Sequence, residues 1–213
     1  MSADALKPEA PAETSPAVGA AQEMPPGRWE GEVLVVRREE DIEPALARLE
    51  GEPVLGFDTE TRPSFRRGVA YPPALIQLAC ADFAVLFQLG RIGFPEGLKA
   101  LLADASVLKA GVAVGRDVQD LQAFSYFHPG GFVELGDMAE RAGLKSRGLR
   151  GLAAEVLGLR IAKGQRTSNW ARDVLTASQI TYAATDAWIG FALHEALRRL
   201  PLPPSPEEGP RPE

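Results

Sequence analysis

Two carboxylates follow an apolar run in the segment Phe57-Asp58-Thr59-Glu60. In an extended chain, residues i and i+2 point to the same side, so Asp58 and Glu60 present their carboxylates together. Two like charges at this spacing repel each other, and a cation between them removes the repulsion. Hard oxygen ligands of this kind suit Mg²⁺ or Mn²⁺. Asp-x-Glu is a common tripeptide, and taken alone it is better explained as the polar exit of a strand.

A further acid stands one helical turn after a tyrosine, in the segment Tyr182-Ala-Ala-Thr-Asp186. The preceding segment Thr176-Ala-Ser-Gln179 has the form of a capping box, which predicts a helix beginning at Thr176. On that helix Tyr182 and Asp186 share one face, where the carboxylate can ligate a metal while the phenol reaches a bound water. A Tyr–Asp pair on the surface is the alternative.

Another acid, Asp117, is predicted in the first turn of a helix that follows a strand beginning near Lys109. The helix dipole favours an acid at that position even without any function, so Asp117 is a weak signal by itself. Asp120 lies one turn further along the same helix. Spacing alone does not choose between these two acids.

The order of the predicted elements indicates an α/β layer fold, in which a mixed sheet covered by helices positions these acids. Short apolar runs rich in Val and Leu predict strands, and two of them, separated only by Ala81 and Asp82, predict an antiparallel hairpin. From Leu135 to Leu200 the pattern is mostly helical. The expected strands lie at residues 32–36, 53–60, 74–80, 84–89 and 107–114, and the expected earlier helices at 40–50, 94–104 and 115–124.

One globular domain, residues 29–200, is expected between two tails. Residues 1–28 and 201–213 are rich in Pro, Ala and Glu, cannot recover the entropy of ordering, and are predicted to be disordered. No window has the roughly eighteen consecutive apolar residues of a membrane span, and the acidic, proline-containing start lacks the form of a signal peptide. The single cysteine, Cys80, cannot form an internal disulfide. These features predict a cytoplasmic location.

The formal net charge of −6 argues by itself against a nucleic-acid partner, because phosphate contacts usually need a surplus of Lys and Arg. Both tails are acidic, however, and the body between them is nearly neutral. Within the body, Lys145–Arg172 carries seven basic residues and one acid, Glu155. A solvated face is the simplest explanation of that stretch unless other features indicate a phosphate ligand.

Three segments together resemble the exonuclease motifs of the DEDD superfamily, in particular its tyrosine subclass. These segments are FDTE at 57–60, KAGVAVGRDVQDL at 109–121 and SNWARDVLTASQITYAATDA at 168–187. Within that subclass the chain resembles the ribonuclease D and Werner-type 3′–5′ exonuclease domains, from about Val33 to about Leu197. The resemblance implies a ribonuclease H-like fold, with a mixed central sheet flanked by helices.

The resemblance also implies a site that holds two Mg²⁺ or Mn²⁺ ions. Asp117 is preferred to Asp120 because Leu121 then follows the acid by four residues, as the family pattern has it. The related histidine subclass would place a histidine at position 181, which is Thr181, so His128 and His194 are expected to be structural. The implied metal ligands are Asp58, Glu60, Asp117 and Asp186, with Tyr182 as the catalytic tyrosine.

By the same resemblance the chain hydrolyses phosphodiester bonds at the 3′ end of DNA or RNA and releases nucleoside 5′-monophosphates. Asp58 is expected to bridge both ions, Glu60 and Asp186 to complete the site that activates water, and Asp117 to support the second ion. Tyr182 is expected to orient or deprotonate the nucleophile. Because a free tyrosine has a pKa of about 10, orientation is the expected role unless the metals lower that pKa.

Nucleic-acid contacts are expected beside the cleft, from basic residues to phosphate and from aromatic rings to bases. For the aromatic rings, packing within the fold is the alternative. The candidates are Arg62, Arg66, Arg67, Lys163, Arg166 and Arg172 for phosphate, and Trp170, Phe65 and Tyr71 for stacking.

Three other functions compete with the exonuclease hypothesis. A catalytically silent module that binds nucleic-acid ends is disfavoured by the intact acidic set. A structural adaptor acting through its tails would be revealed by deleting residues 1–28. A proofreading domain detached from a polymerase is disfavoured because that group is less similar at SNWARDVLTASQ.

Overall fold

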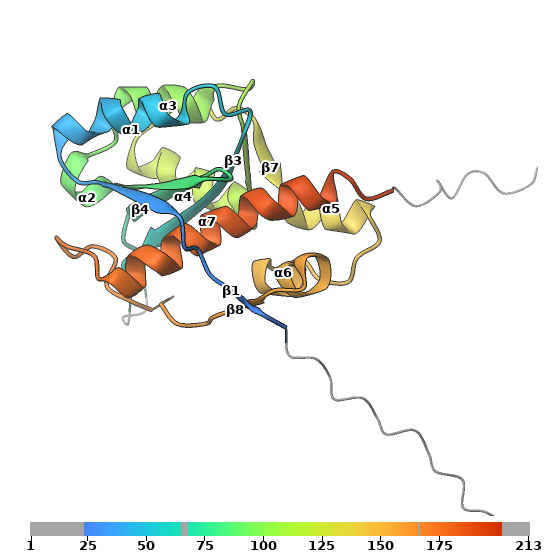
Figure 1. Ribbon diagram of the computed structural model, residues 1–213. Coiled ribbons are helices and arrows are strands. Elements are labelled where there is room, and N and C mark those ends of the chain that lie inside the picture. The colour runs from blue at the N-terminus through green and yellow to red at the C-terminus, as the bar shows by residue number, and fades with distance from the viewer. Residues whose placement is uncertain (1–23, 65–67, 166, 202–213) are drawn as a thin grey trace, which may run out of the picture.

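The computed structural model describes residues 24–64, 68–165 and 167–201, which contain a six-stranded sheet with helices on both faces (Figure 1). The strands run across the sheet in the order β2-β5-β4-β3-β6-β7. This architecture confirms the predicted α/β class. The strands are β2 (Glu32–Val36), β3 (Val54–Thr61), β4 (Pro73–Ala79), β5 (Phe83–Gln88), β6 (Leu108–Gly111) and β7 (Phe132–Glu134).

The sheet is mixed because its centre is antiparallel and its two edges are parallel. β4 pairs antiparallel with both β3 and β5, so the predicted hairpin is confirmed. β2 is parallel to β5, β6 is parallel to β3, and β7 is parallel to β6. The sequence pattern predicted neither the short β7 nor the early end of β6 at Gly111.

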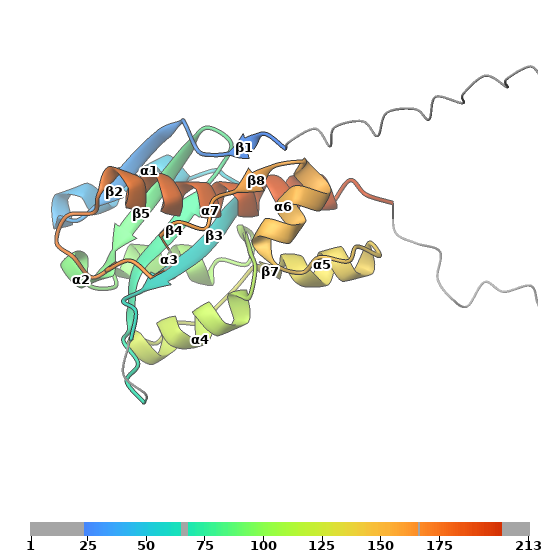
Figure 2. The same cartoon turned by 90° about the horizontal axis from the view of Figure 1, so that it is seen from below.

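Helices cover the two faces of the sheet in separate groups. Apolar side chains of the sheet, among them Phe57, Ile76 and Phe87, share a core on one face with residues of α1, α3 and α4. On the opposite face α7 lies against β3, β4 and β5, and α5 and α6 pack beside α7 (Figure 2). The helices are η1 (Glu39–Asp41), α1 (Ile42–Leu49), α2 (Leu89–Ile92), α3 (Glu96–Ala103), α4 (Val114–Phe124), α5 (Leu135–Arg141), α6 (Leu149–Leu157) and α7 (Ala177–Leu197).

Helix α7 begins where the sequence predicts and lies unusually close to the sheet. The Thr176 hydroxyl accepts from the Gln179 N–H at 3.2 Å, and the Gln179 amide oxygen accepts from the Thr176 N–H at 3.0 Å. Together these bonds form the capping box. A β-carbon at Gly56 would overlap the carbonyl oxygen of Ala187, so only glycine permits this approach. The close contact seats the middle of α7 directly on β3.

The N-terminal segment before β2 is part of the folded domain. β1 (Pro26–Gly27) pairs in parallel with β8 (Arg160–Ile161), and both lie beside α6 (Figure 1). The Trp29 N–H donates to the Thr185 hydroxyl at 2.9 Å, and the Trp29 ring lies 5.8 Å from that of Trp188. Residues 24–28 were expected in the tail. Their contacts with β8 move the start of the domain back from the predicted residue 29.

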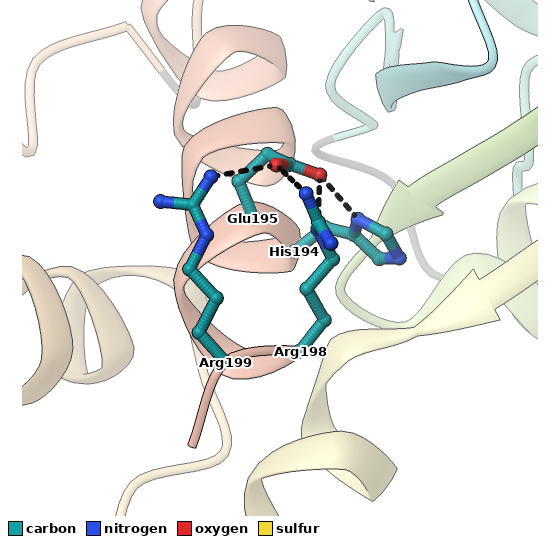
Figure 3. A network of polar contacts seen from close by, with 4 residues as sticks. All are labelled: His194, Glu195, Arg198 and Arg199. Carbon is teal, nitrogen blue, oxygen red and sulfur yellow. Dashed lines mark hydrogen bonds and ion pairs between the residues drawn. The ribbon is translucent and has the colours of Figure 1, made fainter.

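The last turns of α7 carry a polar network centred on Glu195 (Figure 3). The Glu195 carboxylate accepts from Arg198 at 2.7 Å and from Arg199 at 3.1 Å, and lies 3.5 Å from His194 Nδ1. His128 is exposed, with its ring against Tyr126. Both histidines therefore have local contacts that fit the structural role expected for them. Among the described residues, no helix combines the length and apolar character needed to cross a lipid bilayer.

Candidate active site

Three carboxylates from two elements converge at the C-terminal end of β3. Asp58 and Glu60 lie two residues apart on β3, and Asp186 lies on α7 at the point of its closest approach to the sheet. One oxygen from each of the three lies within 4.8 Å of the other two. The same-side arrangement predicted for Asp58 and Glu60 is therefore present, and α7 adds a third ligand atom.

Asp117 lies beside this cluster but outside the group of three. It occupies the first turn of α4, as predicted, and its carboxylate accepts a hydrogen bond of 2.5 Å from the Thr59 hydroxyl. Its charge nevertheless reaches the cluster, since it helps to raise the pKa of Asp58. Asp120 points away into a surface ion pair of 2.9 Å with Arg116. Of the two acids on α4, Asp117 is therefore the one that can serve the site.

The acids disfavour one another's ionised forms. The pKa of Asp58 is raised well above its ordinary value, mainly by burial and then by the charges of Asp186, Asp117 and Glu60. Burial likewise raises the pKa of Asp117 to about 6 and that of Asp186 to about 6. A cluster of hard oxygen donors whose ionised forms are disfavoured in this way suits a divalent cation, which stabilises those forms.

Tyr182 lies one turn before Asp186 on α7, and its hydroxyl donates to the Asp186 carboxylate. Arg150, at the start of α6, brings Nη2 to 3.5 Å from the tyrosine oxygen. Burial, followed by the charges of Asp186 and Glu60, raises the pKa of Tyr182 further above its ordinary value. The phenol therefore keeps its proton and acts as a hydrogen-bond donor, which favours an orienting role.

Two cavities meet at Tyr182 and Asp186. One, of about 520 Å³, contains Asp58 and Glu60 and is bounded by Val112–Ala113 and by the first turn of α6. The other, of about 450 Å³, lies between the N-terminal segment, β8 and α7. Asp186 therefore borders both cavities, whereas Asp58 and Glu60 border only the first.

Comparison with known sequences identifies the family. The sequence pattern that describes 3′–5′ exonucleases matches residues 33–200. The chain belongs to the 3′–5′ exonuclease family. It is 38% identical over 160 residues to the mouse bifunctional 3′–5′ exonuclease/ATP-dependent helicase WRN, covering 72% of this chain and 11% of that protein. It is 34% identical over 194 residues to mouse exonuclease 3′–5′ domain-containing protein 2, covering 81% of this chain and 30% of the relative. The chain thus spans less than a third of either relative.

Solved structures of other exonucleases share the fold. Escherichia coli RNase D superimposes with a TM-score of 0.71 at 23% identity, covering 78% of this chain and 44% of that one. The Nibbler EXO domain of Aedes aegypti superimposes with a TM-score of 0.70 at 23% identity, covering 81% and 89% of the two chains. The ribonuclease H-like fold implied by the sequence resemblance is confirmed.

Of the basic residues predicted to contact nucleic acid, some are exposed on the surface and others lie outside the described residues. Arg62 follows β3 and is exposed, with its guanidinium 4.8 Å from the centre of the Tyr71 ring. Lys163 and Arg172 are exposed on the chain between β8 and α7. Three of the predicted phosphate contacts, Arg66, Arg67 and Arg166, lie outside the described residues, as does Phe65.

The burial of Trp170 contradicts the prediction that its ring stacks on a nucleic-acid base. Its side chain is only 1% exposed and packs in the core beneath α7, with its ring centre 6.1 Å from that of Tyr182. A ring enclosed in this way has no face open to a base. The packing alternative therefore describes Trp170, whose contact supports Tyr182.

Sequence reasoning missed several residues that shape the site. Arg150 stood within the basic stretch without being singled out, and Thr59 stood inside the first motif. Glu134 accepts from the Val114 N–H at 3.0 Å and so fixes the start of α4, which carries Asp117. These contacts join segments far apart in the chain, and local spacing carries no signal for them.

Proposed function

We propose that this exonuclease domain hydrolyses phosphodiester bonds at the 3′ end of DNA or RNA with two Mg²⁺ or Mn²⁺ ions, as a member of the tyrosine subclass. The observation that carries the proposal is the convergence of Asp58, Glu60 and Asp186 within 4.8 Å, with Tyr182 bonded to the last of them. The order and spacing of these residues are those of the subclass they resemble.

The acidic residues would hold the cations. Asp58 belongs to the group of three, and the charge of Asp117 acts on it, so Asp58, Glu60 and Asp186 would hold the ions with Asp117 as a further ligand. Four carboxylates carry four negative charges, which two divalent ions cancel, and an anionic phosphate then meets no net repulsion. When bound, the ions supply stabilisation of charge on the attacking and leaving oxygens of the phosphodiester.

The other side chains would position the reactants. The Tyr182 hydroxyl keeps its proton and orients the attacking water, while Arg150 approaches the same hydroxyl and adds positive charge beside the phosphate. Attack by water on phosphorus breaks the bond to the 3′ oxygen of the preceding nucleotide. The products are a nucleoside 5′-monophosphate and a strand with a new 3′-hydroxyl.

Nucleic acid as the substrate is supported by structures that share the fold. Trypanosoma brucei RNase D was solved with RNA U12, at a TM-score of 0.70, and Brucella melitensis NrnC with the dinucleotide pGG, at a TM-score of 0.64. Both ligands are short strands. Arg62, Lys163 and Arg172 are exposed and are available for phosphate contacts.

The direct test compares single-stranded RNA, single-stranded DNA and recessed duplex DNA, each labelled at the 5′ end, with Mg²⁺, with Mn²⁺ and with EDTA. We expect stepwise shortening from the 3′ end, 5′-monophosphate products, no cutting of covalently closed circles and no activity in EDTA. Full activity in excess EDTA contradicts the metal mechanism. Degradation of closed circles as fast as of free 3′ ends contradicts the polarity.

A silent module that only binds strand ends is the alternative function. Asp58→Ala separates the two functions, because loss of the bridging acid should abolish hydrolysis while the relieved charge repulsion leaves the fold intact. Asp173→Ala, at a side chain that is 81% exposed, is the matched control and should retain activity. Strand binding with no hydrolysis by the wild-type protein under every metal condition establishes the silent module instead.

A further inference from the structure

The cavity between the N-terminal segment and α7 has no role in the mechanism described so far. It is lined by the paired segments around β1 and β8, through Pro26–Arg28 and through Arg160–Ala162 with Gly164 and Gln165. Its base is α7, through Ser178, Thr181 and Thr185. β1 and β8, which form the walls, lie together on the side of α7 next to α6 (Figure 1). Tyr182 and Asp186 line this cavity and also the acidic cavity, so the two cavities adjoin at these side chains.

The walls of this cavity are fixed by specific contacts. The Arg160 N–H donates to the Pro25 carbonyl at 2.9 Å, and the β1–β8 register places Pro26 beside Arg160. Just after β1, the Trp29 N–H is bonded to Thr185 on α7. The N-terminal segment is therefore held against both β8 and α7.

The chemistry of the lining matches one unit of a phosphodiester strand. Arg28 and Arg160 are both exposed, and neither forms an ion pair with any residue in the described part of the chain. Apolar surface from Ile161 and Ala162 suits a sugar or a base. Guanidinium groups bind phosphate through charge-assisted hydrogen bonds, and hydroxyls such as that of Ser178 add neutral ones.

We propose that this cavity binds the nucleotide on the 5′ side of the scissile bond, with Arg28 and Arg160 contacting its phosphate. The inference rests on the proposed exonuclease function. The acidic cavity holds the candidate metal ligands and so takes the scissile phosphate with the terminal nucleotide. The rest of the strand must leave in another direction, and the second cavity begins at the same two side chains and carries unpaired positive charge.

The test uses two substrates that differ on the 5′ side of the scissile bond. In an oligonucleotide of about ten residues the leaving group is a nucleotide with further phosphates, whereas in thymidine 5′-(p-nitrophenyl phosphate) it is p-nitrophenol. For Arg28→Gln and Arg160→Gln we expect KM for the oligonucleotide to rise about tenfold each, the loss typical of one charge-assisted contact. The p-nitrophenyl ester should be hydrolysed at the wild-type rate. The dependence of log KM on log salt should fall by about one per variant.

Two control variants make the comparison specific. Arg141→Gln removes an exposed arginine at the end of α5, away from both cavities, and should leave both substrates unaffected. Arg28→Lys keeps the charge and should recover part of the loss. Equal losses of activity on both substrates would assign the cavity to the terminal nucleotide and overturn the proposal. A wild-type KM for the oligonucleotide in both Gln variants would also overturn it. If the wild-type protein hydrolyses neither substrate, the proposed function itself fails.

Discussion

Neutralising Asp186 should stabilise the metal-free protein in a pH-dependent way. The side chain is 7% exposed, and burial raises its pKa from 3.8 to about 6, against the opposing hydrogen bond from Tyr182 and the charge of Arg150. Because the folded state holds this proton more tightly than the unfolded chain, the resulting stability is present below pH 4 and is lost as the pH rises through 6. Asp186→Asn has nearly the same shape, keeps an oxygen that accepts from Tyr182, and does not titrate.

The size of the effect follows from the displacement of the pKa. A rise from 3.8 to about 6 spans roughly two pH units, and at 1.36 kcal/mol per unit this corresponds to about 3 kcal/mol. For a chain of this length, 1 kcal/mol changes Tm by about 2–4 °C, so the variant should melt roughly 6–12 °C above wild type at pH 8. At pH 4 the two proteins should melt together. Added Mn²⁺ should narrow the gap at pH 8, because it binds the wild-type carboxylates more tightly.

The assay is thermal melting in EDTA at pH values from 4 to 8, with the free energy of unfolding taken from urea denaturation, and both are repeated with Mn²⁺. Asp173→Asn serves as the control, since that carboxylate is 81% exposed and forms a surface ion pair of 3.1 Å with Arg91. Its free energy of unfolding should change by less than about 1 kcal/mol at any pH. Equal stability of wild type and Asp186→Asn at pH 8, or a gain of the same size at pH 4, would refute the reasoning from burial.

Two further predictions concern Tyr182 and the close contact between α7 and β3. Tyr182→Phe keeps the ring packed against Trp170 but removes the hydroxyl. The turnover number should fall by roughly 10²–10⁴, while the Mn²⁺ concentration for half-maximal activity stays near that of wild type. A turnover number within about twofold of wild type at saturating metal contradicts the role of the hydroxyl. Gly56→Ala should lower the free energy of unfolding, measured in urea, by about 3 kcal/mol, because the added methyl group would overlap the Ala187 carbonyl oxygen. The control is Gly90→Ala, whose methyl group would lie in open space on α2 and should leave the free energy of unfolding unchanged. Equal stability of the two alanine variants would show that α7 is free to shift.

The parts of the site that local geometry dictates could be predicted from the sequence. The period of two in a strand places Asp58 and Glu60 on one side whatever the rest of the fold does. The capping box at Thr176 sets the start of α7, and with it the alignment of Tyr182 and Asp186 on one face. Each of these predictions needs only a few consecutive residues. Which elements meet was instead implied by the family resemblance.

Contacts between distant segments account for what the sequence did not reveal. The composition of residues 24–28 indicates a tail, but their partner is β8, more than a hundred residues away. Trp170 lies in a polar, irregular segment that looks exposed, yet α7 and the sheet enclose its ring. Ala113, before α4, adopts a left-handed conformation with φ of 62° that its residue type does not suggest.

The close packing of α7 explains how the domain tolerates an acidic cluster before any cation binds. Repulsion among Asp58, Glu60 and Asp186 would be relieved if α7 moved away from β3. Movement would also expose small buried residues, and Ala183, Ala184 and Ala187 are all fully buried in that contact. The apolar contact runs along more than three turns of the helix, whereas the repulsion acts at one position on it. The carboxylates therefore stay together without metal and relieve the repulsion by holding protons. Divalent cations then compete with those protons at a site whose geometry is already set, so cation affinity should rise as the pH passes through the raised pKa values of Asp117 and Asp186, about 6.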